Sequence, residues 1–264
     1  MARGGSELSV KSVQVTLDVL EAVAFSDDEV GVTELAGRLG LTKGTIFRHL
    51  KTLVDRGYLA QNPATSRYRL GIKSHLLGRM AGAAIDLLAA SEQAMKTLRN
   101  ATGQSVVLSA VEPRAVRVVS TLIGKSSIEI GVRPGSELQF HATAQGKIAL
   151  AFSRRSLLAK LEKQSLARFT DHTITSVSAL RREIERVRSQ GWATAPEQTM
   201  LGINAVAAPV FDSRSGCVGA LAIVGSVQFL RHQPDAAQIS AVKNSAALVS
   251  RNLGFTAGER GAVA

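Results

Sequence analysis

The chain has 264 residues, of which 45% are hydrophobic and 20% charged, a balance that excludes wholesale disorder. At about 150 residues per domain, this length predicts one large domain or two modest ones. The single cysteine, Cys217, excludes an internal disulfide and indicates a reducing compartment. The apolar runs are far shorter than the roughly 20 residues of a membrane helix, and the first 12 residues lack the apolar core of a secretory signal. We therefore expect a cytoplasmic protein without a membrane partner.

The formal net charge of +11 is unevenly distributed along the chain. Residues 38–79 hold nine basic residues and one acid, whereas residues 1–37 hold two basic residues and seven acids. The remaining basic excess is spread over residues 81–264. A concentrated positive field is typical of a surface that meets a polyanion, although a solvated charged face has the same composition.

Three helices and a hairpin are predicted after a short flexible N-terminus. The first helix is expected over residues 13–24, with an apolar face of residues at steps of four, three and four: Val13, Leu17, Leu20 and Ala24. The second covers Thr33–Leu39 and stops at Gly40, a residue type common just past helix ends. The third opens at an N-cap, Thr42, and buries four apolar residues before Gly57: Ile46, Leu50, Leu53 and Val54. Two short strands then follow, Tyr58–Gln61 and Arg67–Leu70.

The rest of the chain mixes helices and strands. A long helical region over Lys73–Ala101 suits a linker or a pairing surface for a second copy. Strands are predicted at Ser105–Ala110, Val116–Thr121, Ser127–Val132, Trp192–Thr194, Ala205–Phe211 and Val218–Val224. Helices are predicted at Ala142–Phe152, Arg154–Glu162, Ser178–Gln190 and Asp235–Leu253. This pattern indicates a sheet domain of the α/β or α+β class.

Residues 32–53 form two predicted helices across a tight glycine turn, the pattern of a helix-turn-helix. In that motif the second helix enters the major groove with its N-terminal residues facing base edges. Basic side chains there can contact guanine or phosphate, and the helix start can bind a phosphate. With one position in the hairpin, the candidate DNA-binding residues are Thr42, Lys43, Gly44, Thr45, Phe47, Arg48, Lys51 and Arg67. A helical bundle with a basic surface is the alternative.

From about Val13 to Leu253 the chain resembles the IclR family of bacterial transcription regulators. The N-terminal resemblance rests on Leu41–Leu50, Leu53–Leu59 and Arg67–Gly71, and the C-terminal one on His141–Lys147, Arg188–Ala193, Gly202, Ala207–Val210 and Leu221–Gly225. The resemblance implies an α+β protein in five parts: a flexible N-terminus (1–12), a winged helix-turn-helix (13–72), a linker and dimerisation helix (73–102), a GAF-like α/β effector-binding domain (103–254) and a flexible tail (255–264). It also implies homodimers or homotetramers on partly palindromic double-stranded operator DNA.

The resemblance further implies a pocket for a small organic effector. Carried over by motif, its candidate residues are Ala144, Gln145, Ala195, Ala205, Ala222 and Val224. Relatives that bind small polar acids are similar in layout but carry polar groups at several of these positions. Here Ala195, Ala205, Ala222 and Val224 lack a hydrogen-bonding side chain, and a carboxylate buried without partners is costly. The sequence therefore predicts a larger, apolar or aromatic effector, while an alternative is that these residues only fill a core.

Reactive side chains do not gather in the sequence. The five histidines lack metal-ligand spacing, namely His49, His75, His141, His172 and His232, and we find neither a catalytic triad order nor paired catalytic carboxylates. We therefore expect no cofactor, no metal and no catalytic residue. Two alternatives stay open: an enzyme of GAF-like or profilin-like fold with a basic DNA-binding module, and a DNA binder whose C-terminal domain senses nothing.

Overall fold

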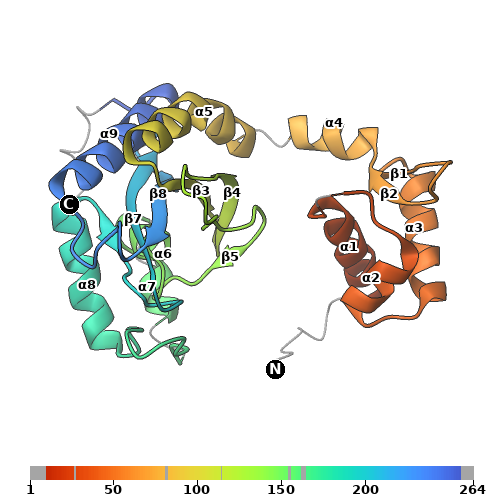
Figure 1. Cartoon of the computed structure of the whole chain (residues 1–264), viewed down its shortest axis with the longest axis horizontal. Coiled ribbons are helices and arrows are strands. Elements are labelled where there is room, and N and C mark those ends of the chain that lie inside the picture. The colour runs from red at the N-terminus through yellow and green to blue at the C-terminus, as the bar shows by residue number, and fades with distance from the viewer. Residues whose placement is uncertain are drawn as a thin grey trace. The chain divides into compact units, whose positions relative to one another are not determined.

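The computed structural model of the protein describes residues 10–26, 28–80, 83–113, 115–153, 156–161 and 165–256. The chain divides into two compact units, Met1–Gly82 and Ala83–Ala264 (Figure 1). Most of the predicted flexible ends, residues 1–9 and 257–264, lie outside the described residues, as do both ends of the helix predicted over residues 154–162.

The first unit contains the predicted three helices and hairpin. Its elements are α1 (Lys11–Ala24), α2 (Val32–Leu39), α3 (Lys43–Asp55), β1 (Leu59–Gln61), β2 (Tyr68–Leu70) and α4 (Ile72–Met80). The two strands pair antiparallel, with Leu59 opposite Leu70. Side chains from all three helices and both strands share one buried core, including Val19, Leu35, Ile46, Leu50, Leu59 and Tyr68. The winged helix-turn-helix is therefore confirmed as a packed unit with its own core.

The turn between α2 and α3 depends on two capping residues. Gly40 ends α2 in the left-handed region (φ +65°), where a glycine lacks the Cβ that would be strained. The Thr42 side chain then accepts a hydrogen bond from the backbone N–H of Thr45, at 3.3 Å, and caps α3. These two caps let the chain turn over three residues, 40–42, and fix where α3 begins.

The buried face of α1 overlaps only in part with the apolar periodicity noted in the sequence. Val13 and Leu17 are 54% and 50% exposed, whereas the helix packs on its unit through Val19 and Val23. Apolar residues recur every three to four positions along two stripes of this helix. One stripe includes Val19 and Val23 and is covered by tertiary packing, whereas Val13 and Leu17 of the other stay exposed. The predicted helix is thus confirmed, and its apolar face is only partly the side that packs, since Leu20 lies against the core.

The second unit is a six-stranded antiparallel sheet with helices on both faces. Its strands are β3 (Ser105–Val111), β4 (Val116–Leu122), β5 (Glu137–Leu138), β6 (Ala193–Thr194), β7 (Ile203–Phe211) and β8 (Cys217–Ser226). Their order across the sheet is β5-β4-β3-β8-β7-β6. The helices are α5 (Ala83–Thr102), α6 (Ala144–Phe152), α7 (Ser156–Leu161), α8 (Val177–Gln190) and α9 (Ala236–Asn252).

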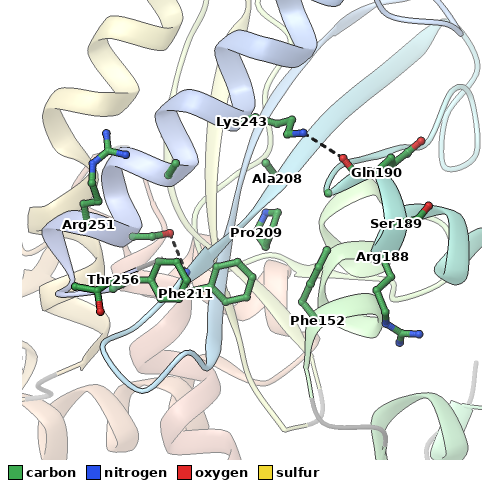
Figure 2. A pocket seen from close by; sticks show the side chains of 14 residues that line it. Phe152, Arg188, Ser189, Gln190, Ala208, Pro209, Phe211, Lys243, Arg251 and Thr256 are labelled. Carbon is green, nitrogen blue, oxygen red and sulfur yellow. Dashed lines mark hydrogen bonds between the residues drawn. The ribbon is translucent and has the colours of Figure 1, made fainter. Parts of the chain in front are cut away.

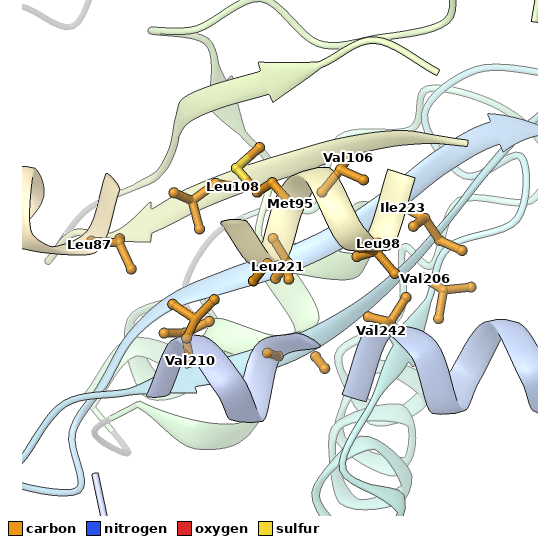
Figure 3. Packing of buried hydrophobic residues seen from close by; sticks show 14 of the residues in the cluster. Leu87, Met95, Leu98, Val106, Leu108, Val206, Val210, Leu221, Ile223 and Val242 are labelled. Atoms are coloured by element: carbon orange, nitrogen blue, oxygen red, sulfur yellow. The ribbon is translucent and has the colours of Figure 1, made fainter. Parts of the chain in front are cut away.

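Alternate residues of each strand serve two separate cores. On one face, Leu221 and Ile223 pack with α5 and α9, and Figure 3 shows Leu98 and Val242 reaching that cluster from these two helices. On the other face, Ala220 and Ala222 pack against α6 and α8. Small residues dominate this second face, so α6 can lie close to the strands. This arrangement confirms the α+β class.

The helical region predicted over residues 73–101 consists of two helices. The first, α4, is tied to the first unit, because the Ser74 hydroxyl donates to the carbonyl of Tyr58 at 2.8 Å and Lys73 lies over the Tyr58 ring. The second, α5, buries Leu87, Met95 and Leu98 on the sheet of the second unit. Residues 81 and 82, between them, lie outside the described residues. The two halves of the region therefore belong to different units.

The strand predicted at Ser127–Val132 is not a strand, and the prediction was wrong there. The sheet instead gains β5 at Glu137–Leu138, which pairs with β4 opposite Val116 and Arg117. Ile130 and Val132 still pack against a small buried cluster of Val107, Val118 and Val224. Apolar residues alternate in this segment because Ile130 and Val132 are partly buried, and a loop can bury alternate side chains as well as a strand can. The other predicted elements are confirmed with small shifts of their ends.

Candidate nucleic-acid interface and ligand site

The solvent face of α3 carries most of the predicted DNA-binding residues. Its N-terminal turn exposes Lys43 and Gly44, and the next two turns expose Phe47, Arg48 and Lys51. The opposite face of the helix buries Ile46, Leu50 and Leu53 in the first unit. The packing of α3 therefore turns its basic side chains outward as one group.

The cations on this face are not neutralised by the protein. Among the residues that the structure describes, no acid forms an ion pair with Lys43, Arg48 or Lys51. Thr42 and Thr45 lie beside them at the helix start, their hydroxyl oxygens 3.0 Å apart. A row of unpaired cations beside a helix N-terminus is suited to a polyanion.

Arg67, the predicted contact from the hairpin, is occupied by the protein itself. Its Nε donates to the carbonyl of Glu29 at 2.6 Å, and its guanidinium forms an ion pair of 3.1 Å with Glu34 of α2. These contacts attach the hairpin to α2. The structure thus separates Arg67 from the unpaired group on α3.

The histidine-containing motif at 141–147 is a structural junction in the second unit. A ring nitrogen of His141 hydrogen-bonds the carbonyl of Ala167 at 2.8 Å, which attaches the start of this motif to a distant loop. The fully buried ammonium of Lys147 donates to Glu183 at 3.1 Å and to the carbonyl of Thr194 at 2.7 Å. Burial lowers the pKa of Lys147, and the nearby Glu183 carboxylate opposes that shift. The motif therefore joins α6, α8 and β6.

The six predicted effector residues converge on one side of the sheet. Ala144, Ala195 and Ala222 belong to the same buried cluster, and Ala205 packs against it. Val224 lies opposite Ala205 across the β7–β8 pair, and Ala205 also packs against its small cluster. Gln145 is buried in the first turn of α6. Ala205 is half-buried and the other five are buried, and of the six only Val224 lines the cavity described next.

A cavity of about 320 Å³ opens beside Val224. It combines apolar side chains such as Ile130 and Ile203 with the polar groups of Gln104 and Ser105. Its outer lining includes four strongly exposed apolar side chains, those of Ile128, Met200, Leu201 and Phe229. Sequence reasoning missed these residues, because they come from segments that only the pairing of β3, β8 and β7 brings together.

Two family descriptions match the chain and together span nearly all of it. Residues 12–63 match "IclR helix-turn-helix domain", and residues 81–251 match "Bacterial transcriptional regulator IclR C-terminal". The chain belongs to the IclR family. The IclR resemblance seen in the sequence is thereby confirmed, and the protein is a transcriptional regulator with a helix-turn-helix DNA-binding domain.

Curated IclR relatives match over almost their whole length. The glycerol operon regulatory protein of Streptomyces griseus is 30% identical over 250 residues, which cover 93% of this chain and 97% of that protein. The HTH-type transcriptional regulator XynR of Escherichia coli is 30% identical over 253 residues, which cover 94% of this chain and 99% of XynR. Both are named as regulators rather than enzymes.

Solved IclR structures share the fold. A regulator from Alicyclobacillus acidocaldarius is 26% identical with a TM-score of 0.75, over 93% of this chain and 100% of the other. A homologue from Microbacterium hydrocarbonoxydans, crystallised with 4-hydroxybenzoate, is 19% identical with a TM-score of 0.77. The match covers 92% of this chain and 98% of the homologue. In the described part of the chain, no helix combines the length and apolar character needed to cross a bilayer.

Proposed function

We propose that this protein is a ligand-responsive regulator that reads operator DNA through α3. The unpaired row of Lys43, Arg48 and Lys51 on the solvent face of a capped helix carries this proposal. In the complex, Thr42, Gly44, Thr45 and Phe47 lie along the same contact. Arg67 takes part only by exchanging Glu34 for a phosphate. Residues 13–72 form the DNA-binding domain, 73–102 the linker and 103–254 the sensor.

A homodimer on two half-sites accounts for the exposed stripe of α1. Val10, Val13 and Leu17 are apolar and exposed, and packing within the first unit leaves them uncovered. A second copy of the same stripe would remove them from water. A dimeric helix-turn-helix protein binds half-sites about one helical turn or a multiple of it apart, so its operators would be partly palindromic.

Arg48→Ala is the direct test of the DNA contact. If Arg48 reads a base, the variant loses about 1–3 kcal/mol of specific binding, measured by fluorescence anisotropy on a genomic fragment that the wild type binds. If Arg48 contacts a phosphate, binding weakens uniformly and its salt dependence becomes shallower. The control is Arg182→Ala, which removes an exposed arginine of α8. Unchanged operator affinity of Arg48→Ala would remove this residue from the interface.

The sensor is proposed to bind an apolar or aromatic organic acid next to Val224. The nearby side chains that face the same side of the sheet are mostly aliphatic, and Gln104 and Ser105 add polar groups to the lining of the cavity. Such a site suits a ligand with an apolar body and one polar group. 4-Hydroxybenzoate is a rational first probe, because it has this chemistry and a protein of the same fold was crystallised with it.

Thermal melting tests ligand sensing. A ligand that binds only the folded state raises the melting temperature, by an amount set by its concentration relative to Kd. We expect stabilisation by 4-hydroxybenzoate or a related aromatic acid and no shift with glyoxylate or pyruvate. Stabilisation by the two small acids alone would contradict the apolar character of the site. A panel without any response would favour the alternative of a DNA binder whose C-terminal domain senses nothing.

A further inference from the structure

A second hollow lies beside the outer edge of the sheet in the second unit. β6 pairs with β7 only at Ala193–Ala207 and Thr194–Val206, so in the described structure no strand covers the outer side of residues 208–211. A groove of about 690 Å³ lies there, between the C-terminal end of α8 and the exposed side of α9 (Figure 2). None of the six predicted effector residues lines it.

The inner wall of the groove is aromatic. The rings of Phe211 and Phe255 stack with their centroids 5.2 Å apart, and Phe152 meets Phe211 edge-to-face at 5.8 Å. Ala208 and Pro209 of β7 complete this wall. A planar or aliphatic body laid on it would lose contact with water and gain contact with the rings.

The rim of the groove is cationic. Its lining includes Arg188, Lys243 and Arg251, all exposed, and contains no acid. Across the groove, Lys243 Nζ donates to the carbonyl of Gln190 at 3.2 Å (Figure 2). Arg188 uses its Nε on the carbonyl of Ala151 at 3.0 Å, which leaves its two terminal nitrogens for another acceptor. Within the described residues, these three cations form no ion pair with a protein carboxylate.

We infer that this groove is a second small-molecule site, which binds an amphipathic organic anion such as an aromatic carboxylate. Its aromatic wall holds the apolar body, while Lys243 and the two rim arginines attract the carboxylate. The volume lies within the range of sites for small organic molecules. The site goes beyond the effector pocket proposed above, since the two share no lining residue.

Isothermal titration of the full-length protein with 1-naphthoate tests this site. Ala247 of α9 is exposed and lines the groove, so Ala247→Trp fills the groove without entering the core. Each chain is expected to lose one 1-naphthoate site, even if the cavity beside Val224 also binds the probe. The matched control is Ala237→Trp, an exposed alanine of the same helix outside the groove. An unchanged number of sites in Ala247→Trp would overturn the inference.

The charge requirement has its own test. Lys243→Gln is expected to weaken 1-naphthoate binding at this site about tenfold, because a charge-assisted contact is lost. Arg182→Gln, an exposed cation of α8 outside the groove, should bind like the wild type. Equal binding of uncharged 1-naphthalenemethanol would overturn the anion specificity. A changed sedimentation coefficient of Ala247→Trp, with 1-naphthoate binding intact, would instead identify the groove as an interface between copies.

Discussion

Glu197 shows how one carboxylate can hold several loops in place. It lies between β6 and β7 with a left-handed backbone (φ 54°), and its Oε1 accepts the backbone N–H of Gly202 at 2.8 Å. Its Oε2 lies 2.7 Å from Nε2 of His232 and 3.8 Å from Nε2 of His172. The Gly202 hydrogen bond, followed by the contact with His232, lowers the pKa of Glu197 below its ordinary value of about 4.5. Glu197 thus joins the loops before α8, before β7 and before α9.

The titration of Glu197 predicts a specific loss of stability in acid. Because its pKa is lower in the folded than in the unfolded protein, its carboxylate stabilises the fold above about pH 4.5, and this contribution is lost as the pH falls through the folded-state pKa. Glu197→Gln should therefore unfold at lower urea than the wild type at pH 7, and the two should converge below pH 4.5. The control is Glu129→Gln, an exposed carboxyl in the same unit. A difference that stays constant between pH 7 and pH 3 would contradict this role.

Helix α3 is an element with two independent faces. Its buried side is fixed by Ile46, Leu50 and Leu53, so the helix is held firmly to the unit. Its exposed side contains Gly44, where an added Cβ would meet no atom within 4 Å. A glycine in this position weakens the helix without any need from internal packing. We therefore propose that its small size allows α3 to approach DNA closely.

Gly44→Ala separates folding from DNA binding. The variant should gain about 0.5–1 kcal/mol in the free energy of unfolding, because alanine favours helix and nothing obstructs its methyl group. Its operator affinity should fall if α3 approaches the bases closely. Gly37→Ala is a matched control, since Gly37 is an exposed glycine of α2 with equally open space around it. A Gly44→Ala protein with wild-type affinity would exclude a close approach of this turn to DNA.

At the scale of the whole molecule, the two units build their hydrophobic cores from separate parts of the chain. Leu50 is fully buried in the first unit, and Leu221 is fully buried between the sheet and two helices of the second. Each unit therefore has the apolar burial needed to fold as a domain. Charge is not divided in the same way, because residues 38–79 concentrate nine basic residues around α3 while the other unit holds 21 spread over its length.

Matched core truncations should reveal the two cores in scanning calorimetry. Leu50→Ala is expected to destabilise the first unit by about 2–5 kcal/mol and to lower its transition, while the second transition stays in place. Leu221→Ala should do the reverse by a similar amount. If either variant lowers both transitions equally, the two units unfold as one cooperative body.

The sequence by itself determined the features that depend on neighbouring residues. The caps at Gly40 and Thr42, the buried stripe of α3 and the hairpin were all predicted, because glycine conformation, hydroxyl capping and helical periodicity act within a few residues. The effector-binding role that the family motifs imply for residues such as Ala205 and Val224 stays a prediction.

Only the tertiary structure decided which surfaces are covered. It left Val13 and Leu17 exposed, buried Ile130 and Val132 without a strand, and used Arg67 to attach the hairpin to α2. It also brought distant segments together as the cavity beside Val224 and the groove beside residues 208–211. Periodicity shows that a stripe is apolar, but the partner that covers it is set by contacts between residues far apart in the chain.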